Sequence, residues 1–314
     1  MIALSLVGPA AVELVDIPYP VAGNGEVVVS VELVGICGSE IHDSRTLEYR
    51  RPPVVMGHEI VGIVADGTRV AINPLVSCGV CRTCLSGRPN ICLSRQVLGI
   101  HRPGGFTSAV SVPASQLTAV PVSASAAQAI MAEPMANAGH AWSLSGASPS
   151  ARVGILGAGS IGLSVALVAS VHGAQVDIVE PVPERQAAVA AVGANLLTTL
   201  SDGYDVIFDC VGTASAHQAS VDGLGNGGTA VWLGLTDEDP GFGGTGLVRG
   251  EKSVRGSYGF TPAEFREAVQ LVTRVPLSWV SVKPLSEGPQ IFASLWQGHV
   301  GAPKVAFRPH TGGL

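Results

Sequence analysis

Four cysteine side chains lie close together in one loop of the chain, and their spacing suits a single metal ion. They follow the pattern C-x2-C-x2-C-x7-C, at Cys78, Cys81, Cys84 and Cys92. Four thiolates fill the tetrahedral shell of Zn²⁺ and leave no position for water, which makes such a site structural rather than catalytic. Disulfide pairing or coincidence is the alternative, but the chain has only six cysteines and four of them fall here. The spacing therefore predicts a structural zinc site.

Two further groups with metal-binding chemistry occur earlier in the chain, each in a segment flanked by glycine. Cys37 lies in Gly35-Ile36-Cys37-Gly38-Ser39-Glu40-Ile41-His42, and His58 lies in Gly57-His58-Glu59. A thiolate and an imidazole are suitable zinc ligands, and a catalytic zinc needs three protein ligands and one open position. A single buried cysteine or histidine usually does no more than pack. Here both lie in glycine-flanked segments upstream of a separate cysteine loop, which favours a second zinc.

A glycine-rich turn later in the chain has the pattern G-x-G-x-x-G. The pattern alone is weak, but here it follows the apolar segment 153–156 and opens a helix-forming segment, within a βαβ unit of about 30 residues. The first glycine permits a tight turn, the second lets the backbone approach a pyrophosphate, and the third lets helix and strand pack closely. The diphosphate then meets the positive end of the helix dipole. A plain strand-to-helix turn is the alternative, but the context predicts a dinucleotide site that includes Gly157, Gly159, Ser160, Ile161 and Gly162.

An acidic residue follows the next predicted strand, 175–179, about 20 residues beyond the glycine turn. This residue, Glu180, can accept hydrogen bonds from the adenosine ribose hydroxyls and would repel a 2′-phosphate. Arg185 could in principle meet such a phosphate. With Glu180 in place we expect NAD as the cofactor, and we expect Arg185 on the following helix as a solvated charge.

The elements that must position these groups are of two kinds. Over about the first 120 residues, segments such as 12–15, 26–34 and 60–65 alternate or are rich in β-branched residues, with Pro and Gly between them, and predict strands. Residues 124–145 are rich in Ala and Met, which predicts helices crossing between domains. From residue 152 strands alternate with helices, which predicts a parallel, doubly wound sheet.

This organisation predicts an α/β protein of two domains, because the chain is long enough for two hydrophobic cores. We expect a mainly β catalytic domain over residues 1–123, with the zinc lobe at 78–92. We expect a Rossmann dinucleotide-binding domain over residues 124–260. The last segment, 261–314, opens with a helix capped by Thr261 and returns to the catalytic domain.

The composition argues against several classes of function. Hydrophobic content is 46%, but no apolar run approaches the roughly 20 residues that span a bilayer. The first residues lack a basic region and alternate, so we expect a strand there rather than a signal peptide. A formal charge of −6 with scattered basic residues argues against a nucleic-acid surface. Clustered thiols that must stay reduced to hold zinc favour a cytoplasmic protein.

Together these segments resemble the zinc-dependent medium-chain dehydrogenase/reductase superfamily, that is, the alcohol dehydrogenase family, over nearly the whole chain. The match continues through Gly104-Gly105-Phe106 and Phe208-Asp209-Cys210-Val211-Gly212. The resemblance implies a GroES-like fold for the catalytic domain. It also implies that Cys37 and His58 bind a catalytic zinc, with Glu59 as the carboxylate beside the metal that exchanges with water.

Further residues near Cys37 match the family's proton relay. Ser39 matches the hydroxyl that receives the substrate proton, and His42 matches the distal member of the relay to solvent. Glu40 stands where the family usually has an aspartate that contacts the ligand histidine. Its side chain is one carbon longer than that of aspartate, which changes the geometry of that contact.

The third ligand of the catalytic zinc distinguishes branches of the family. Many simple alcohol dehydrogenases supply a cysteine, but Cys210 falls in the predicted cofactor sheet and is badly placed. The segment Ala132-Glu133-Pro134-Met135 resembles the Glu-Pro segment of sorbitol, sugar-acid and threonine dehydrogenases, in which the glutamate faces the metal. We therefore expect Glu133 as the third ligand; the alternative is a carboxylate that only favours the start of a helix.

The resemblance implies a zinc-dependent oxidoreductase that transfers hydride between NAD and a secondary alcohol. The small-molecule substrate is expected to be a polyol, sugar or sugar acid; a threonine-type amino alcohol or a simple alcohol is the alternative. A zinc-independent enone or quinone reductase and a non-catalytic zinc- or nucleotide-binding protein are alternatives of other classes. We expect two zinc ions per chain, a homodimer or homotetramer, and no nucleic-acid or membrane partner.

Overall fold

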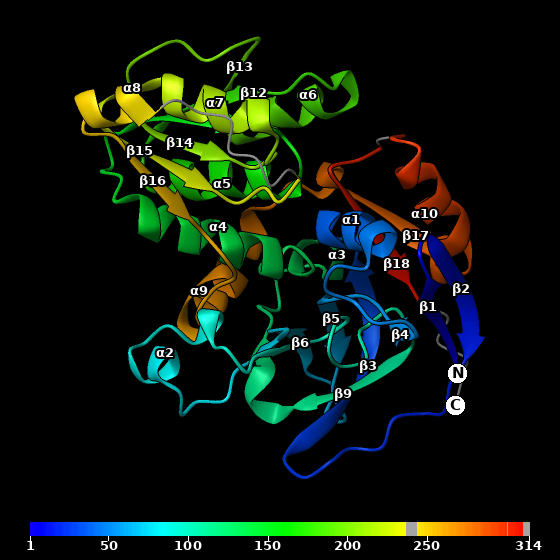
Figure 1. Cartoon of the computed structure of the whole chain (residues 1–314). Helices are drawn as coiled ribbons and strands as arrows, with labels where there is room; N and C mark the ends of the chain where they lie inside the picture. The colour runs from blue at the N-terminus through cyan, green and yellow to red at the C-terminus, as the bar shows by residue number, and fades with distance from the viewer. Residues whose placement is uncertain (237–243, 300, 310–314) are drawn as a thin grey trace. The chain divides into compact units, whose positions relative to one another are not determined.

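The computed structural model describes residues 1–236, 244–299 and 301–309. By the contacts between its residues, the chain divides into two compact units (Figure 1). One unit joins Met1–Glu133 to the described part of Thr261–Leu314, and the other is Pro134–Phe260. The contact division therefore falls after Glu133, whereas the sequence placed the first boundary at 123/124.

The unit Pro134–Phe260 is built on a parallel sheet. Among the described residues its strand order is β13-β12-β11-β14-β15-β16. The strands are β11 (Arg152–Leu156), β12 (Gln175–Val179), β13 (Asn195–Leu197), β14 (Tyr204–Asp209), β15 (Leu224–Trp232) and β16 (Ser253–Gly256). This is the order of a Rossmann fold, so the predicted doubly wound sheet is confirmed.

Helices connect these strands, as expected for parallel neighbours (Figure 1). Helix α4 (Ala132–Ser145) leads into β11, and the connecting helices are α5 (Ser160–Val171), α6 (Pro183–Val189), α7 (Ala214–Asp222) and α8 (Gly244–Arg249). The strand order reverses between β11 and β14. The crevice beyond the carboxyl ends of those two strands is therefore the place where a doubly wound sheet binds a dinucleotide.

The other unit is mainly β. Its largest described sheet has the order β10-β6-β5-β3-β18-β17, with β9 also paired to β3. Two smaller sheets have the orders β2-β1-β4 and β7-β8. The strands are β1 (Ile2–Gly8), β2 (Ala11–Asp16), β3 (Glu26–Gly35), β4 (Val54–Val55), β5 (Glu59–Ile63), β6 (Arg69–Ile72), β7 (Leu75–Val76), β8 (Gln96–Val97), β9 (Ala109–Pro113), β10 (Leu117–Ala119), β17 (Val280–Pro284) and β18 (Lys304–Arg308).

The C-terminal segment completes this β unit. Strand β18 pairs antiparallel with β3, with Ala306 opposite Gly35 and Phe307 opposite Val34. Phe106 packs edge-on against Phe307, with ring centroids 5.3 Å apart. The helices of this unit are α1 (Gly38–Thr46), α2 (Arg82–Leu85), α3 (Ala126–Ala129), α9 (Pro262–Leu271) and α10 (Gly288–Trp296). The strand that ends beside Cys37 is thus held by residues from the far end of the sequence.

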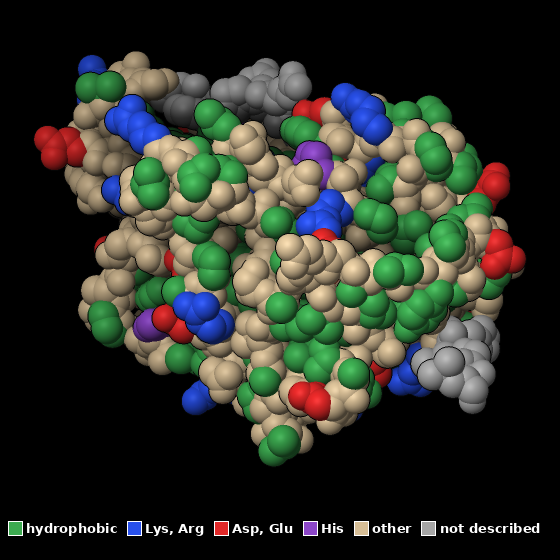
Figure 2. Space-filling model, turned by 90° about the horizontal axis from the view of Figure 1, so that it is seen from below, with side chains coloured by type: hydrophobic (Ala, Val, Ile, Leu, Met, Phe, Trp, Pro, Cys, Tyr) green, Lys and Arg blue, Asp and Glu red, His purple; other side chains and the backbone are tan. Residues whose placement is uncertain are grey.

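Charged side chains are scattered over the face of the molecule shown in Figure 2, with both signs interspersed among apolar and polar atoms. No helix in the described parts of the chain combines the length and the apolar character needed to cross a bilayer.

Candidate functional site

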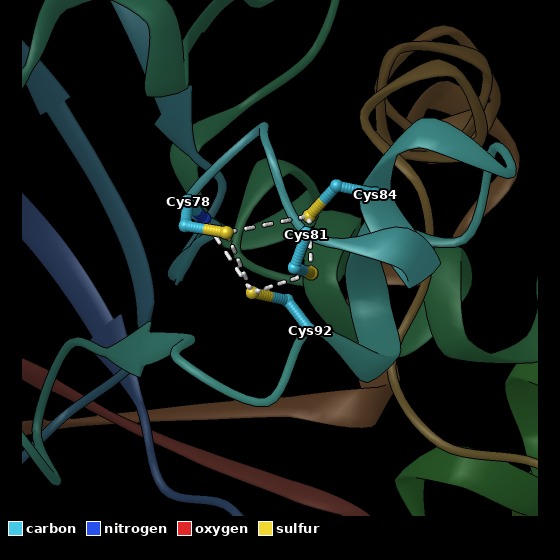
Figure 3. Close-up of side chains that lie close together, drawn as sticks. All are labelled: Cys78, Cys81, Cys84 and Cys92. Carbon is cyan, nitrogen blue, oxygen red and sulfur yellow. Dashed lines mark hydrogen bonds between the residues drawn. The ribbon is translucent and has the colours of Figure 1, made fainter.

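The four cysteines of the loop point their sulfur atoms toward one another (Figure 3). The distance from Cys78 Sγ to Cys92 Sγ is 3.5 Å, and that from Cys81 Sγ to Cys84 Sγ is also 3.5 Å. Cys81 and Cys92 are separated by 3.7 Å, and Cys78 and Cys84 by 4.0 Å. Zinc–sulfur bonds of about 2.3 Å in a tetrahedron place the sulfurs about 3.8 Å apart, whereas a disulfide needs about 2.05 Å. The geometry fits a shared ion.

The local chain places one of these thiols at the start of helix α2. The hydroxyl of Thr83, 3.1 Å from Cys81 Sγ, lowers the pKa of Cys81 to about 5, so this thiol is a thiolate at neutral pH. Loss of hydration and the neighbouring Cys81 raise the pKa of Cys84 to about 12. Four thiolates this close repel one another. A bound divalent cation is therefore needed to keep all four cysteines deprotonated.

A second group of potential ligands is formed by Cys37, His58 and Glu59. One ligand atom from each lies within 4.8 Å of the others. Cys37 caps the start of α1, and Glu59 begins β5. Between them, Gly57 has a φ of +97°, and a Cβ there would lie 2.7 Å from the ring of Phe106. Only glycine fits this turn, which presents His58 to Cys37.

The imidazole of His58 is oriented by a buried glutamate. Oε1 of Glu40 lies 3.2 Å from His58 Nδ1 and accepts a hydrogen bond of 2.7 Å from the amide of Gly57. The other oxygen of Glu40 accepts from the amide of Cys37 at 3.1 Å. The side chain of Glu40, which is longer than that of aspartate, therefore reaches His58. The two groups lie at an ion-pair distance, but no well-aligned hydrogen bond forms at Nδ1. Since Nδ1 faces Glu40, Nε2 is the nitrogen left for a metal.

The charges around His58 favour a cation at this place. Burial alone would lower the pKa of His58, but the charges of Glu40 and Cys37 outweigh it and raise that pKa well above its usual value. Burial would likewise raise the pKa of Glu40, but His58 and Arg50 hold it below its usual value. A metal ion at the imidazole would take the place of the proton that these anions stabilise.

A buried arginine anchors this arrangement. Arg50 Nη1 pairs with Asp43 Oδ2 at 3.0 Å, and its Nε donates to the carbonyl of Gly99 at 2.9 Å. Its Nη2 lies 3.8 Å from Glu40 Oε1. Asp43 in turn accepts from the amides of Tyr49 and Arg50, at 2.7 Å and 2.9 Å. The network ties helix α1 to the segment that leads to His58. It could not be predicted from the sequence, because Arg50 stands in a run of polar residues.

Glu59 has a buried cationic partner that sequence reasoning also missed. Lys304 Nζ donates to Glu59 Oε1 at 2.6 Å and to the carbonyl of Ile36 at 2.9 Å. The second oxygen of Glu59 is buried and has no hydrogen-bond partner among the described residues. A buried anionic oxygen that accepts no hydrogen bond there, and that lies beside a thiol and an imidazole, is a suitable ligand for a cation.

Ser39 and His42, the predicted relay residues, both lie on α1, three positions apart. Residues with this spacing are neighbours on a helix surface. Both are partly exposed. In the described part of the chain no hydrogen bond joins their side chains directly, so a relay through them needs a further group between the two.

Glu133, the predicted third ligand, lies in the first turn of α4 and is 9% exposed. Its charge contributes to the raised pKa of Lys304, for which burial acts in the opposite direction and Glu59 is the main charge partner. Its carboxylate is not among the three ligand atoms that lie within 4.8 Å of one another. The structure thus brings Glu59 to Cys37 and His58, and Glu133 as third ligand stays a prediction.

The chemistry of this donor set fits Zn²⁺. One thiolate, one neutral imidazole and one carboxylate carry two negative charges, which balance the ion. Cys37, His58 and Glu59 supply three ligand atoms within reach of one centre, as a site with an open fourth position requires.

The glycine turn has the shape that a dinucleotide needs. Gly157 has a φ of +92°, and a Cβ at Gly162 would lie 1.9 Å from the carbonyl oxygen of Gly157. Gly159, the N-cap of α5, has open space where a Cβ would stand. Ser160 and Ile161 form the first turn of α5 behind it. The three glycines therefore meet the requirements for a tight turn, close backbone approach and close helix packing.

Glu180 lies directly after β12 and holds the glycine turn. Its Oε2 accepts from the amide of Ala158 at 2.7 Å, and its Oε1 accepts from the amide of Val182 at 2.8 Å. Each carboxylate oxygen keeps a further lone pair for a ligand. Arg185 was expected as a solvated charge, but its side chain is 33% exposed and its Nη1 lies 4.0 Å from Glu180 Oε2.

The chain is similar to known dehydrogenases over most of its length. Residues 23–122 match the family model of the alcohol dehydrogenase GroES-like domain, and residues 160–274 match that of zinc-binding dehydrogenases. L-galactonate-5-dehydrogenase of Escherichia coli K12 is 32% identical over 279 residues, which cover 81% of this chain and 82% of that protein. The chain belongs to the zinc-dependent medium-chain dehydrogenase superfamily.

Other members of this superfamily extend the comparison. L-threonine 3-dehydrogenase of Streptomyces coelicolor is 33% identical over 275 residues, covering 78% of this chain and 80% of that protein. A zinc-binding dehydrogenase from Sinorhizobium meliloti 1021, solved with NADP bound, has a TM-score of 0.91 at 29% identity and covers 98% of this chain and 99% of its own. The expected family, with its GroES-like and Rossmann domains, is thus confirmed.

Proposed function

We propose that this medium-chain dehydrogenase is a zinc- and NAD-dependent oxidoreductase of secondary alcohols, with a polyol, sugar or sugar acid as substrate. The observation that carries the proposal is the convergence of Cys37, His58 and Glu59 in the β unit of a chain whose other unit has a dinucleotide turn. A purely structural metal site would need a closed shell, as in the four-cysteine lobe.

The chain's own residues have distinct tasks in this reaction. Cys37, His58 and either Glu59 or Glu133 would hold a zinc ion, which supplies a Lewis acid that lowers the pKa of a substrate hydroxyl. Glu40 fixes the ring of His58, and the Arg50–Asp43 pair holds helix α1 to the segment that leads to His58. Ser39 Oγ receives the substrate proton and His42 passes it to solvent. The cofactor supplies the redox chemistry, and the glycine turn binds and orients it.

Glu180 supports NAD as the cofactor. Its carboxylate is buried beside the turn and would lie close to a 2′-phosphate, where the like charges repel. Arg185 offsets part of that charge at 4.0 Å. We propose that the carboxylate, held by two backbone amides, dominates the preference.

The two relatives define the leading substrate and its alternative. One is named for L-galactonate, a polyhydroxylated sugar acid, and the other for L-threonine, an amino alcohol. Both substrates carry a second polar group next to a secondary alcohol, which can contribute binding energy that ethanol cannot. The two relatives resemble this chain to nearly the same extent, at 32% identity over 81% of it and 33% identity over 78% of it, so a substrate panel separates the two classes.

NADH formation measured at 340 nm with a panel of sugar acids, polyols, threonine and ethanol tests the proposal. We expect a polyol or sugar acid to exceed ethanol by about a hundredfold in kcat/KM, or about 2.7 kcal/mol of transition-state binding. Threonine as the best substrate would replace the first class by the alternative. Equal or better turnover of ethanol would contradict both.

We further propose that the enzyme works in the cytoplasm, where a reducing environment keeps the four zinc-binding thiols reduced, and that it forms a homodimer or homotetramer. Light scattering of the zinc-loaded protein tests the assembly, and a monomeric mass would contradict it.

A further inference from the structure

Asp209, the last residue of β14, uses both carboxylate oxygens in a buried arrangement. Its Oδ1 accepts from the amides of Val211 and Gly212, at 2.8 Å and 2.9 Å. Its Oδ2 lies 2.8 Å from Nδ1 of His217 on α7. An ionised carboxylate can only accept, so Nδ1 carries the proton in this pair. One carboxylate thus joins the loop after β14 to the following helix.

The imidazole of His217 is itself fixed. Its ring stacks on that of Trp232 at the end of β15, with centroids 3.8 Å apart and the planes 20° from parallel. The indole Nε1 of Trp232 donates to Ser220 Oγ at 2.9 Å, and Ser220 Oγ donates to the carbonyl of His217 at 2.7 Å. His217, Ser220 and Asp209 are all buried. His217 is therefore locked in the orientation in which it donates to Asp209.

The loop held by this carboxylate lies beside the dinucleotide turn. A Cβ at Gly157, the first glycine, would lie 2.8 Å from Cγ2 of Val211. The amide of Gly157 donates to the carbonyl of Val179, the last residue of β12, at 2.8 Å. The next amide, that of Ala158, donates to Glu180. Val211 thus lies beside Gly157, and Glu180 binds the amide of the next residue. Val211 is 37% exposed, which leaves an apolar surface open there.

This placement identifies the part of the dinucleotide concerned. An acidic residue at the end of the second strand of a Rossmann unit binds the adenosine ribose, which places the adenosine half at Glu180. Val211 lies beside the glycine that precedes Ala158, the residue bound by Glu180, so its exposed side chain would lie near that half of the cofactor. The loop position is set by the two amides that Asp209 binds.

We propose that His217 is a positioning residue for the adenosine half of the dinucleotide, acting through Asp209 and the loop of residues 210–213. This inference rests on the proposed dinucleotide binding. Without His217, Oδ2 of Asp209 is a buried anionic oxygen without its partner, and the carboxylate must turn away from the loop amides or admit water. The apolar face of Val211 then no longer lies in one fixed place beside the turn.

The test compares His217→Leu with His217→Asn in the zinc-loaded enzyme. In asparagine, Nδ2 can occupy the place of the imidazole Nδ1 and donate to Asp209, whereas leucine cannot donate. We expect His217→Leu to raise the KM for NAD about tenfold and the inhibition constant of AMP by a similar factor, while kcat at saturating NAD stays within about twofold of the unaltered enzyme. A tenfold change corresponds to about 1.4 kcal/mol. His217→Asn should recover most of both losses.

Ser220→Ala is the matched control, because it removes the bonds to Trp232 Nε1 and to the carbonyl of His217 but keeps the His217–Asp209 pair. We expect it to change neither constant by more than about twofold. The inference is overturned if His217→Leu leaves the AMP constant unchanged, if His217→Asn does not recover it, or if kcat falls while both constants hold. If the unaltered enzyme binds neither NAD nor AMP in a calorimetric titration, the proposed function fails instead.

Discussion

Lys304 Nζ lies 2.6 Å from Oε1 of Glu59, although the two residues are 245 positions apart in the sequence. Both side chains are 1% exposed. Burial opposes the charge on the lysine, but the attraction of Glu59, Cys37 and Glu133 outweighs it and raises the pKa of Lys304. The C-terminal strand thus places a permanent cation next to a carboxylate of the candidate metal site.

Removal of Lys304 should destabilise the enzyme strongly, because Glu59 would remain as a buried charge without its partner. We expect Lys304→Met to lower the free energy of unfolding by about 3 kcal/mol, measured by urea denaturation of protein that holds zinc in the four-cysteine lobe alone. Lys304→Arg keeps the charge and should lose much less. The double variant Lys304→Met/Glu59→Gln should recover part of the loss. A Lys304→Met protein as stable as the unaltered one would show that the pair contributes nothing.

Glu40 should control how firmly the second site holds zinc, because it orients His58. We expect Glu40→Gln, which keeps the shape but not the charge, to weaken zinc binding at this site by about 10- to 100-fold. Competition with a coloured chelator measures the affinity, and the four-cysteine lobe, which lies apart from Glu40, provides an internal control. Unchanged release of the second zinc from Glu40→Gln would contradict this role.

The fold was accessible from the sequence because its main signals are local. The signals for the dinucleotide site lie within one short segment: a strand, the glycine turn after it, and the acidic residue after the next strand. Each of these positions requires a particular type of residue for a physical reason. The cysteine loop is also local, since Cys78 to Cys92 belong to a single turn-rich segment. Patterns of this kind need no knowledge of the distant chain.

The contacts around the second site could not be read in the same way. Lys304 meets Glu59 only because β18 pairs with β3, and sequence spacing does not reveal that register. Arg50 looks like one of several exposed charges until its guanidinium is seen to bind Asp43. Arg185 was expected in solvent for the same reason, but the turn into α6 directs it toward Glu180. Partners of long charged side chains depend on tertiary structure.

Glu180 should set the preference between NAD and NADP. Glu180→Gln keeps the size and shape of the side chain but removes its negative charge. The kcat/KM for NADP should therefore rise relative to that for NAD. Arg185→Ala, which removes the nearby cation and leaves the carboxylate, should shift the ratio further toward NAD. Steady-state kinetics with both cofactors measure the ratios. A higher kcat/KM for NADP in the unaltered enzyme would contradict the assigned role of Glu180.

The zinc ion expected in the four-cysteine lobe should be structural. Cys84→Ser removes one of four ligands that lie 3.5 to 4.0 Å from their neighbours, so we expect loss of this ion and a lower melting temperature. The second zinc should remain in the protein that stays folded. Native mass spectrometry counts the ions, and a single zinc in fresh, active, unaltered enzyme would contradict the two-site model.

Glu133 and Glu59 compete for the role of third ligand, and their variants separate them. Glu59 lies with Cys37 and His58 but is held by Lys304, whereas Glu133 is buried at the start of α4 and acts on the same lysine. If Glu133 moves onto the metal when zinc is bound, Glu133→Ala should lose that zinc and nearly all turnover, while the lobe zinc and the fold remain. Glu133→Gln is the size-matched control, since it keeps an oxygen but not the charge that balances Zn²⁺. Full activity and two zinc ions in Glu133→Ala would assign the third position to Glu59, and Glu59→Ala should then be the variant that loses the metal.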